Sequence, residues 1–411
     1  MSEWKTYKLC EVADLSTGFP FNGHKYAKEG QRVVRGDNVT IGELRWDTDK
    51  DKRWNEPFVR AEEFSLREGD IVIGMDGSRV GRNRAQIKAE DLPLLLAQRV
   101  ACVRHNAKSL QKFLYYQIFS KNFENYIKSV HTGTSIPHVS LKQIGDFSFQ
   151  VPDLLTQQRI AAILGSLDDK IELNRRINAN LEEQAQALFK SWFVDFEPFR
   201  DGPFVDSELG KIPQGWKEGN YTDIVEIRGG GTPKTDMQEY WNGNIPFFSP
   251  KDVGAGCFIL DTEKHITAKG LENCNSSLFQ PNTVFITARG TVGKVVMSGT
   301  EMAMNQTNYA LLGKQNIPQY YVYHITLQLV GRLLKKANGA VFNAITTRDF
   351  ACEQIVIPPY STIKHFSDIV KPIYENILLN EVQSNRLSAL RDTLLPKLMS
   401  SELSVKNDYE L

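Results

Sequence analysis

Cysteine and histidine are scarce in this chain of 411 residues, and neither residue type is spaced for a special site. The five cysteines are scattered and include no Cys-x-x-Cys pair, and the seven histidines show no metal-ligand spacing. An odd, scattered set of thiols excludes a disulfide framework and is typical of a reducing compartment. We therefore expect neither a bound metal nor a cofactor.

Net charge and long apolar runs are also lacking. The 49 Lys and Arg residues balance the 49 Asp and Glu residues, so the formal net charge at pH 7 is zero. This balance gives no sign of a nucleic-acid partner, although a local basic stripe can be offset elsewhere in a chain. No run reaches the roughly 18 apolar residues that a membrane helix needs, and Met1-Ser-Glu-Trp4 opens without the apolar core of a signal peptide. We expect a cytoplasmic protein with no membrane partner.

What the chain does contain is an internal repeat, in which two long helical patterns lie 206 residues apart. In each copy the same positions recur in alternating steps of four and three residues. The first series is Ile160, Leu164, Leu167, Ile171, Asn174, Asn178, Leu181, Ala185 and Leu188, and the second is Phe366, Val370, Ile373, Ile377, Asn380, Ser384, Leu387, Arg391 and Leu394. Each series follows a strand-like stretch that ends in proline, at Pro152 and Pro358.

The four–three step predicts the seam of a coiled coil, because about 3.5 residues per turn keep such a seam facing one partner. A pseudo-two-fold repeat requires the two helices to pair antiparallel. Asn174 and Asn380 are the central seam positions, so we expect them to contact each other and to fix the helix register. Two ordinary amphipathic core helices would also show an apolar period, and this alternative stays open.

Globular segments precede each helix and repeat in the same order, with an offset that drifts between the copies. A turn and a short strand at 68–74 and at 280–286 lead into two Gly-rich loops, Asp76–Gly81 and Arg289–Gly293. The matching segments that follow are 97–99 with 305–307 and the helical runs 110–130 with 318–337. This order predicts two mixed α/β domains that carry variable loops on a common frame.

Five segments of the chain resemble the specificity subunits of type I restriction–modification systems. The most specific stretch is Gln186-Ala-Leu-Phe-Lys-Ser-Trp-Phe-Val-Asp-Phe196, which is similar to the central conserved region of that family. The other segments are Val151–Ile160, Leu167–Asn174, Leu209–Trp216 and Leu390–Leu398. Together they extend the resemblance over the whole chain.

This resemblance implies a non-catalytic subunit that chooses the DNA sequence. Two target-recognition domains would each read one half of a split, asymmetric site in double-stranded DNA, and the helices would set the unread gap. Two methyltransferase subunits would dock on the helical regions, and restriction subunits would complete the nuclease.

We therefore predict a mixed α+β fold with a pseudo-two-fold internal repeat. Two globular target-recognition domains would be separated by a pair of long antiparallel coiled-coil helices. The predicted boundaries are 1–150 for the first domain, 151–200 for the central helix, 201–214 for a linker, 215–357 for the second domain, 358–404 for the C-terminal helix and 405–411 for a tail.

Basic and small polar residues in the globular loops are the candidates for DNA contact. Arginine can bind guanine with two hydrogen bonds in the major groove, and both Lys and Arg neutralise phosphates. Small polar residues on Gly-containing loops allow close approach to DNA, although any surface loop carries such residues. The candidates are Arg79, Arg82, Arg84, Lys88, Thr134, Ser135, His138, Arg289, Lys294 and Asn343.

Large apolar residues on the first long helix are the candidates for partner docking: Leu173, Phe189, Trp192 and Phe193. If these side chains are exposed, they provide an apolar surface for the methyltransferase subunits. The alternative is that they pack within the core of this chain, and the sequence leaves both interpretations open.

Motifs for catalysis are weak, and we expect no enzyme activity from this chain alone. Ile357-Pro-Pro-Tyr360 is similar to the Asn-Pro-Pro-Tyr loop of adenine methyltransferases, but isoleucine replaces the asparagine that would bind the target amine. Gly229–Thr235 lacks the Walker spacing of a phosphate loop. Two alternatives remain. A single-chain restriction–methylation enzyme would need a further methyltransferase domain, and a protein-binding scaffold on a duplicated coiled coil would show no salt-dependent DNA binding.

Overall fold

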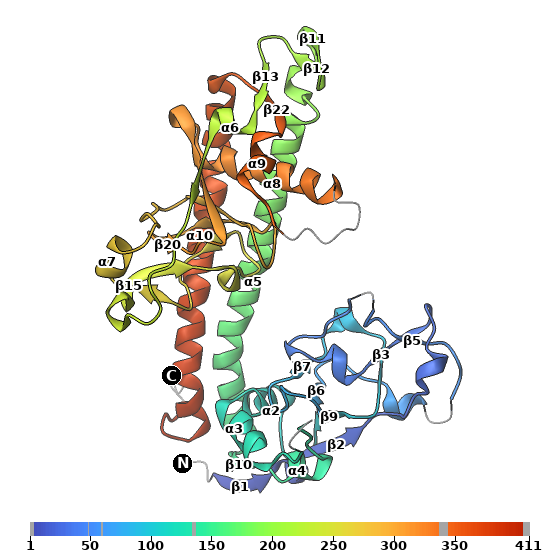
Figure 1. Cartoon of the computed structure of the whole chain (residues 1–411). Helices are drawn as coiled ribbons and strands as arrows, with labels where there is room; N and C mark the ends of the chain where they lie inside the picture. The colour runs from blue at the N-terminus through green and yellow to red at the C-terminus, as the bar shows by residue number, and fades with distance from the viewer. Residues whose placement is uncertain (1–3, 48, 59–60, 134–136, 337–343, 406–411) are drawn as a thin grey trace, which may run out of the picture. The chain divides into compact units, whose positions relative to one another are not determined.

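The computed structural model describes residues 4–47, 49–58, 61–133, 137–336 and 344–405. By its internal contacts the chain forms two units: Met1–Lys170 with Leu387–Leu411, and Ile171–Arg386. Each unit contains one globular domain and a share of two long helices, α5 and α10 (Figure 1). In the part of the chain that the structure describes, no helix is long and apolar enough to cross a membrane.

Three small sheets form the globular domain of the first unit. The five-stranded sheet has the order β2 (Ala13–Thr17), β9 (Val100–His105), β6 (Ile71–Gly74), β7 (Arg84–Gln86) and β4 (Ile41–Gly42). The three-stranded sheet has the order β5 (Arg53–Trp54), β3 (Gln31–Val34) and β8 (Leu94–Leu96), and β1 (Lys5–Lys8) pairs with β10 (Ser148–Val151).

The burial of strand β6 shows that both faces of the five-stranded sheet are covered. All four of its residues, Ile-Val-Ile-Gly, are buried, as expected for a strand covered on both faces. Ile71 and Ile73 join a cluster with the helical residue Phe113, whereas Val72 joins a second cluster with Val34 of the small sheet. Alternate side chains therefore point to a helical layer and to the three-stranded sheet.

Short helices complete the first unit. The α-helices are α1 (Leu9–Val12), α2 (Gln111–Ile118), α3 (Lys121–Val130) and α4 (Leu141–Gly145), and the 3-10 helices are η1 (Gly23–Lys25), η2 (Gly36–Asn38), η3 (Ala61–Phe64) and η4 (Ala89–Asp91). The single helical run predicted at 110–130 is interrupted at Ser120. Its side chain accepts a hydrogen bond from the Phe123 backbone N–H and so caps a new helix, α3.

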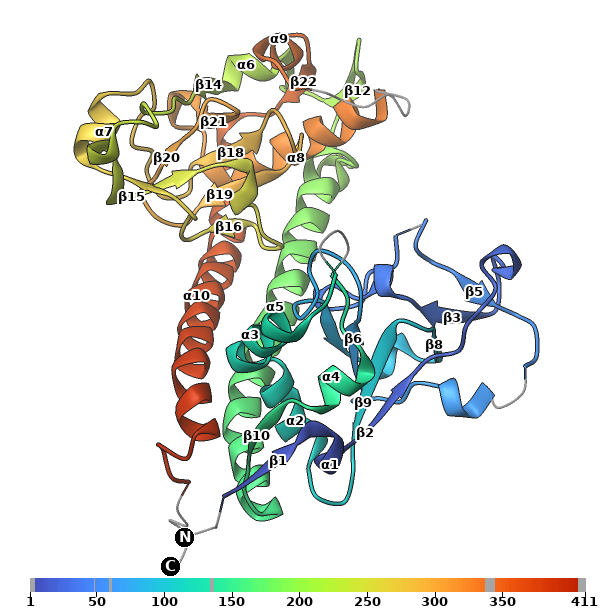
Figure 2. The same ribbon diagram turned by 60° about the horizontal axis from the view of Figure 1, so that its bottom comes forward.

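The second unit has sheets with the same strand orders as the three sheets of the first unit, and Figure 2 labels several strands of both. Its five-stranded sheet has the order β14 (Val225–Gly229), β21 (Asn308–Gly313), β18 (Val284–Thr287), β19 (Val295–Ser298) and β16 (Phe258–Ile259). Its smaller sheets are β17 (His265–Ile266) with β15 (Trp241–Phe248) and β20 (Ala303–Met304), β13 (Lys217–Asn220) with β22 (Gln354–Ile357), and the hairpin β11 (Phe204–Ser207) with β12 (Gly210–Pro213).

Strand directions repeat as well. β4 pairs parallel with β7, and β3 with β8, just as β16 pairs parallel with β19, and β15 with β20. The helices of the second unit are α6 (Tyr221–Ile224), α7 (Ala268–Glu272), α8 (Gln319–Lys336) and α9 (Thr347–Ala351), with 3-10 helices η5 (Glu197–Phe199), η6 (Gln238–Tyr240), η7 (Pro250–Asp252) and η8 (Lys314–Asn316). The internal repeat is therefore present in the fold, with the β11–β12 hairpin added in the second unit.

The long helices α5 (Leu154–Phe193) and α10 (Tyr360–Met399) each contain 40 residues. Both their first and their last residues lie 206 positions apart, which is the offset of the sequence repeat. The side chain of Asp153 accepts a hydrogen bond of 2.8 Å from the Thr156 backbone N–H and so caps the start of α5. At the end of the α5–α10 pair that belongs to the first unit, Asp168 Oδ1 lies 2.7 Å from Arg391 Nη1.

A buried polar network joins α5 to α10 within the second unit. Asn174 Nδ2 donates to the Asn380 carbonyl at 3.3 Å and to Gln383 Oε1 at 2.9 Å. Asn380 Nδ2 donates in turn to Asn178 Oδ1 at 2.9 Å, and Asn178 Nδ2 donates to the Ile377 carbonyl at 3.2 Å. Partner numbers fall along α10 as they rise along α5, so the helices run antiparallel here. The expected contact between Asn174 and Asn380 is present, and its role in fixing register stays a prediction.

Candidate nucleic-acid interface

An open cleft of about 520 Å³ lies in the first domain, where three loops of the two larger sheets meet. These loops follow β3, β6 and β8, and the cleft walls also include Phe21 and Tyr26. Four arginines and two aspartates line the cleft, so its charge is positive although the whole chain is neutral. The charged lining residues are Arg35, Arg45, Arg79, Arg99, Asp37 and Asp76.

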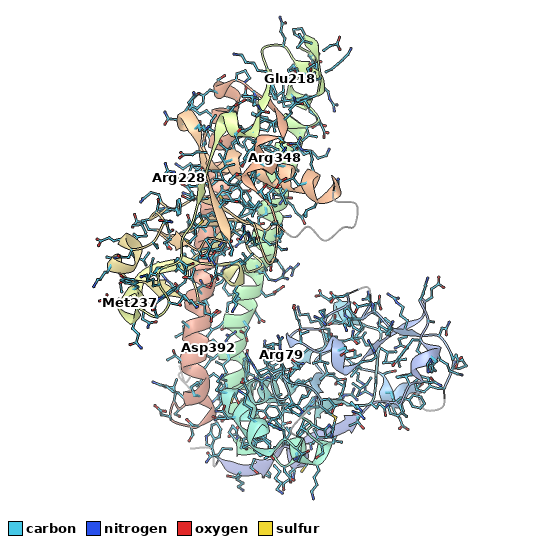
Figure 3. The ribbon with its side chains drawn as sticks, in the orientation of Figure 1. Arg79, Glu218, Arg228, Met237, Arg348 and Asp392 are labelled. Carbon is cyan, nitrogen blue, oxygen red and sulfur yellow. The ribbon has the colours of Figure 1, made fainter. Side chains whose placement is uncertain are left out.

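The Gly-rich loop after β6 carries Arg79, whose side chain is exposed and labelled in Figure 3. Gly77 and Gly81 on either side have φ angles of +103° and +81°, which glycine adopts without strain. A Cβ on Gly81 would lie 2.8 Å from Ile127 Cγ2 of α3, so glycine also allows the loop to pack on this helix. Among the described residues no ion pair engages Arg79, which leaves its guanidinium available to phosphate oxygens.

Asp76 joins two loops that the sequence analysis treated as separate candidates. His138 Nδ1 contacts one carboxylate oxygen of Asp76, and Arg99 Nη1 donates to the other at 3.0 Å. The Gly77 backbone N–H also donates to the Pro137 carbonyl at 3.0 Å. Burial raises the pKa of Asp76, but the hydrogen bonds from His138 and Arg99 outweigh burial, so its pKa lies below the ordinary value.

Two further cleft arginines were not found from the sequence. Arg35 lies 4.0 Å from Asp37, and its guanidinium stands over the ring of Tyr26, with the central carbon 5.6 Å from the ring centroid. Arg45 Nε lies 3.1 Å from Asp47 Oδ2. Arg35, Arg45 and Arg99 were missed because they belong to separate segments of the sequence and only the fold brings them together.

Arg84, which the sequence suggested as a DNA contact, is buried in the structure. Its side chain is 7% exposed and donates to the Gly81 carbonyl at 3.0 Å and to the Phe119 carbonyl at 3.3 Å. Burial lowers the pKa of Arg84 to about 10, although the nearby Glu124 acts in the opposite direction. A guanidinium that is buried and bound to carbonyls supports the packing of loop and helix, so the expectation of DNA contact at Arg84 was wrong.

The neighbours of Arg84 do not form a basic stripe. Arg82 is exposed but lies 3.7 Å from the carboxylate of Glu124. Lys88 is exposed, lies 3.8 Å from Glu90, and is not among the residues that line the cleft. The structure describes all four cations predicted around this turn, and of these four Arg79 alone lines the cleft.

The second domain has an equivalent cleft of about 530 Å³. Its loops correspond to those of the first domain but carry different side chains: Ser249–Lys251 after β15, Arg289–Thr291 after β18, and Asn305 with Thr307 after β20. Gly290 and Gly293 again have positive φ angles, and a Cβ on Gly293 would lie 3.1 Å from Val330 of α8. The charged residues in its lining are Lys251, Lys264, Arg289 and Glu263, so the net charge of this cleft is also positive.

The remaining predicted DNA contacts are placed as follows. Arg289 is exposed in the second cleft, and Lys294 is exposed but does not line it. Thr134, Ser135 and Asn343 lie outside the described residues. The segments beside them do reach the Gly-rich loops, because Asp76 forms a β-bridge with His138 and Arg289 forms one with Ala344.

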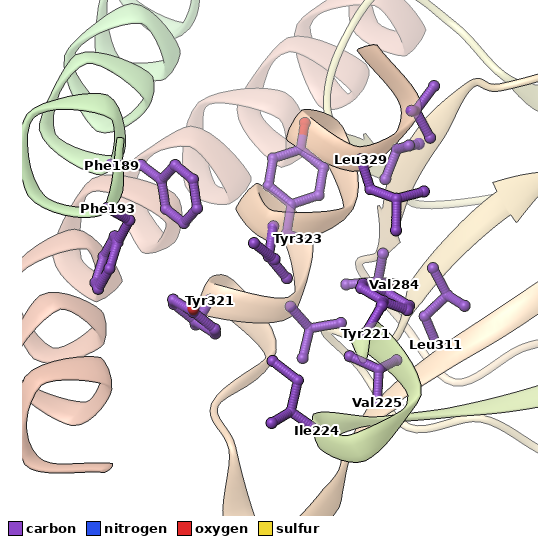
Figure 4. Packing of buried hydrophobic residues seen from close by; sticks show 14 of the residues in the cluster. Phe189, Phe193, Tyr221, Ile224, Val225, Val284, Leu311, Tyr321, Tyr323 and Leu329 are labelled. Atoms are coloured by element: carbon purple, nitrogen blue, oxygen red, sulfur yellow. The ribbon is translucent and has the colours of Figure 1, made fainter. Parts of the chain in front are cut away.

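The predicted docking residues divide between core and surface. Phe189 and Phe193 are buried, and their ring centroids lie 5.9 and 5.1 Å from that of Tyr321 (Figure 4). These two residues belong to the core of the second unit, so the expectation that they form an exposed docking surface was wrong. Trp192 is partly buried against the same core, and Leu173 is 48% exposed.

Two half-buried carboxylates were missed by the sequence analysis. Glu182 of α5 and Glu381 of α10 line a cavity of about 470 Å³ in the second unit, together with the loop 252–261. Burial raises the pKa of Glu381 to about 7, and the neighbouring Glu182 acts in the same direction. The backbone N–H groups of Cys257 and Phe258 bind these two carboxylates, so the pair anchors the loop to the helices.

Comparison with known proteins assigns this pair of domains to a family. The family of the type I restriction modification DNA specificity domain matches residues 1–183 and again residues 213–389. The type I restriction enzyme HindI specificity subunit of Haemophilus influenzae is 25% identical over 468 residues, covering 98% of this chain and 100% of that protein. The MjaIX specificity subunit of Methanocaldococcus jannaschii is 28% identical over 303 residues, covering 72% of this chain and 70% of that protein.

A solved structure agrees in fold. The S subunit of a type I restriction–modification system from M. genitalium covers 98% of this chain and 97% of its own, with a TM-score of 0.57 at 15% identity. The mixed α/β architecture, with two sheet domains and two packed long helices, is thus the fold of such subunits. The chain belongs to the type I restriction–modification specificity family, as a non-catalytic DNA specificity subunit.

Proposed function

We propose that each globular domain reads one half of a split, asymmetric site in double-stranded DNA through its cleft. The observation that carries this proposal is the pair of equivalent clefts, which three corresponding loops form in each domain. Positive lining residues attract the phosphate backbone, and their polar side chains can reach base edges. Because the two linings differ in sequence, the two half-sites differ as well.

The long helices are the elements that set the unread gap between the half-sites. Forty residues of α-helix span about 60 Å, and both helices have this length. The buried network around Asn174 and Asn380 supports a single register, since sliding α5 along α10 would break its hydrogen bonds. A fixed register gives a fixed distance between the two readers, as dimer geometry does for palindromic sites.

Two methyltransferase subunits dock on the helical regions in this proposal, and restriction subunits join them. Exposed apolar side chains in the second-unit part of the helices support docking. Leu173 and Ile177 lie one turn apart on α5, with 48% and 38% of their surfaces exposed, and Leu379 of α10 is 64% exposed. Contiguous apolar patches mark interaction surfaces, and Leu173 and Ile177, four residues apart on one face of α5, support such a patch.

Co-purification of the chain with the methyltransferase subunit encoded beside it, followed by sequencing of adenine methylation in host DNA, tests this proposal. We expect a stable assembly and a methylated motif with two defined halves and an unread gap. A stable assembly whose DNA affinity does not fall with salt, and which methylates no split motif, would favour the scaffold function instead.

A further inference from the structure

Arg99 has a backbone conformation that arginine rarely adopts. Its φ angle is +66°, in the turn that connects β8 to β9. A side chain in this left-handed region is strained, and glycine or asparagine would be better tolerated there. A strained backbone at an arginine that lines a cleft suggests that its side chain has a function there.

The guanidinium of Arg99 is both exposed and oriented. Its side chain is 72% exposed, while that of Asp76, to which Nη1 donates at 3.0 Å, is 24% exposed. The second oxygen of Asp76 contacts His138, whose backbone is tied to Thr132 by hydrogen bonds of 2.7 and 2.8 Å. Three loops thus hold one guanidinium in place. Within the part of the chain that the structure describes, no other hydrogen bond or ion pair engages it, so its remaining N–H groups can meet a ligand.

The carboxylate of Asp76 beside Arg99 favours one of two groups that Arg99 could bind on DNA, a phosphate or the edge of a base. A phosphate bound to Arg99 would stand close to the charge of Asp76 and be repelled by it. The major-groove edge of guanine is neutral and presents two acceptors, O6 and N7, which match a guanidinium in a fixed plane. Arg79 in the same cleft has no carboxylate partner among the described residues, and its environment suits a phosphate.

We propose that Arg99 reads a guanine in the half-site of the first domain, with Asp76 and His138 as positioning residues. This inference rests on the proposed function, because it assigns one base to one of the two clefts. It identifies a specificity-determining residue and the chemical group that this residue recognises.

The second domain provides an internal contrast. Thr307 occupies the position that corresponds to Arg99, and Arg289 the position that corresponds to Asp76. Asn305 Oδ1 accepts hydrogen bonds from the Thr307 backbone N–H at 3.0 Å and from its hydroxyl at 2.7 Å. The turn is therefore held without a guanidinium, and the second half-site is not read by this arrangement.

The experiment measures base preference in the assembled complex of the full chain with its methyltransferase subunits. A DNA library randomised at both half-sites is selected by the wild type and by Arg99→Lys, which keeps the charge but loses the planar fork. Asp76→Asn keeps an acceptor without its charge, and Arg67→Gln removes an exposed arginine outside the cleft as a control.

We expect the wild type to select a guanine at one position of one half-site. Arg99→Lys should reduce the preference for that guanine by about ten-fold or more and leave every other position unchanged, since a bidentate contact supplies such discrimination. Asp76→Asn should reduce the same preference by less, and Arg67→Gln should not change it. A uniform loss of affinity in Arg99→Lys, with the preference intact, would overturn the inference and leave the two-cleft function standing. A wild type without a split motif would overturn both.

Discussion

Replacing Glu381 with glutamine should stabilise the second unit at alkaline pH and have little effect at acidic pH. Glu381 lies with Glu182 in a cavity between the long helices and the loop 252–261, and Asp252, Asp261 and Arg175 are the other charged residues of its lining. A Cβ built on Gly256 would lie 2.2 Å from Glu381 Oε1, so the loop backbone passes directly over this carboxylate. Ionisation of Glu381 is therefore less favourable in the folded chain than in water.

The sign and the size of the effect follow from the pKa of Glu381. A carboxyl whose pKa rises from 4.5 to about 7 on folding contributes stability that is complete below pH 4.5 and is lost as the pH rises through 7. This shift corresponds to about 3 kcal/mol at high pH, an upper value because Glu182 titrates in the same cavity. Glutamine has no charge to bury, and its amide oxygen can still accept the hydrogen bond from Phe258.

Thermal unfolding of wild type and Glu381→Gln between pH 4 and pH 8 is the assay. The difference in Tm should grow by roughly 5–10 °C over this range, since about 2–3 kcal/mol acts on a unit of some 200 residues. Comparing two variants at each pH cancels the titration of all other groups. Glu183→Gln, one residue from Glu182 but exposed, is the matched control and should show no such trend. A Tm difference that is constant with pH would refute the reasoning.

Other changes separate the roles of particular residues. Arg79→Gln should weaken binding to all DNA sequences and lower the salt dependence by about one phosphate contact, measured by titration at several salt concentrations. Arg84→Gln should lower Tm by several degrees without changing that salt dependence, because its side chain is buried. Asn174→Leu removes the hydrogen bonds of Nδ2 and a buried Oδ1 that has no partner among the described residues. Because an apolar side chain at a seam position packs against the partner helix, the variant should raise Tm and relax the accepted gap length, seen in the methylated motif. Exchanging residues 1–150 for those of another family member should change one half of that motif, and a change in both halves would contradict the two-reader proposal.

The helical frame was accessible from the sequence because its signal is local and periodic. Helix ends depend on neighbouring residues, such as Asp153 at the start of α5, and the seam repeats every few positions. The contact between Asn174 and Asn380 followed from the symmetry of two equal seams. The burial of Phe189 and Phe193 was not predicted, although Ala185 precedes them at the same spacing of four and is buried too.

The clefts could be predicted in part. The Gly-rich loops were recognised because glycine at a turn is a local signal, and these loops do line both clefts. Arg35, Arg45 and Arg99 could not be grouped, since long-range strand pairing brings their loops together. Arg84 was misassigned because the sequence does not tell a buried cation from an exposed one when its partner, Glu124, lies 40 residues away.

The separation between buried strands and exposed loop ends has a consequence for how such subunits diversify. The residues of β6 and β18 are buried and hold each domain together, whereas Arg79 and Arg289 project from the loops that follow and stabilise no core. Substitutions at the cleft can therefore accumulate with little loss of stability. If each cleft reads one half-site, as we propose, and the two clefts vary independently on one shared frame, the number of DNA sites available to a population of such chains is the product, and not the sum, of the variants of each cleft.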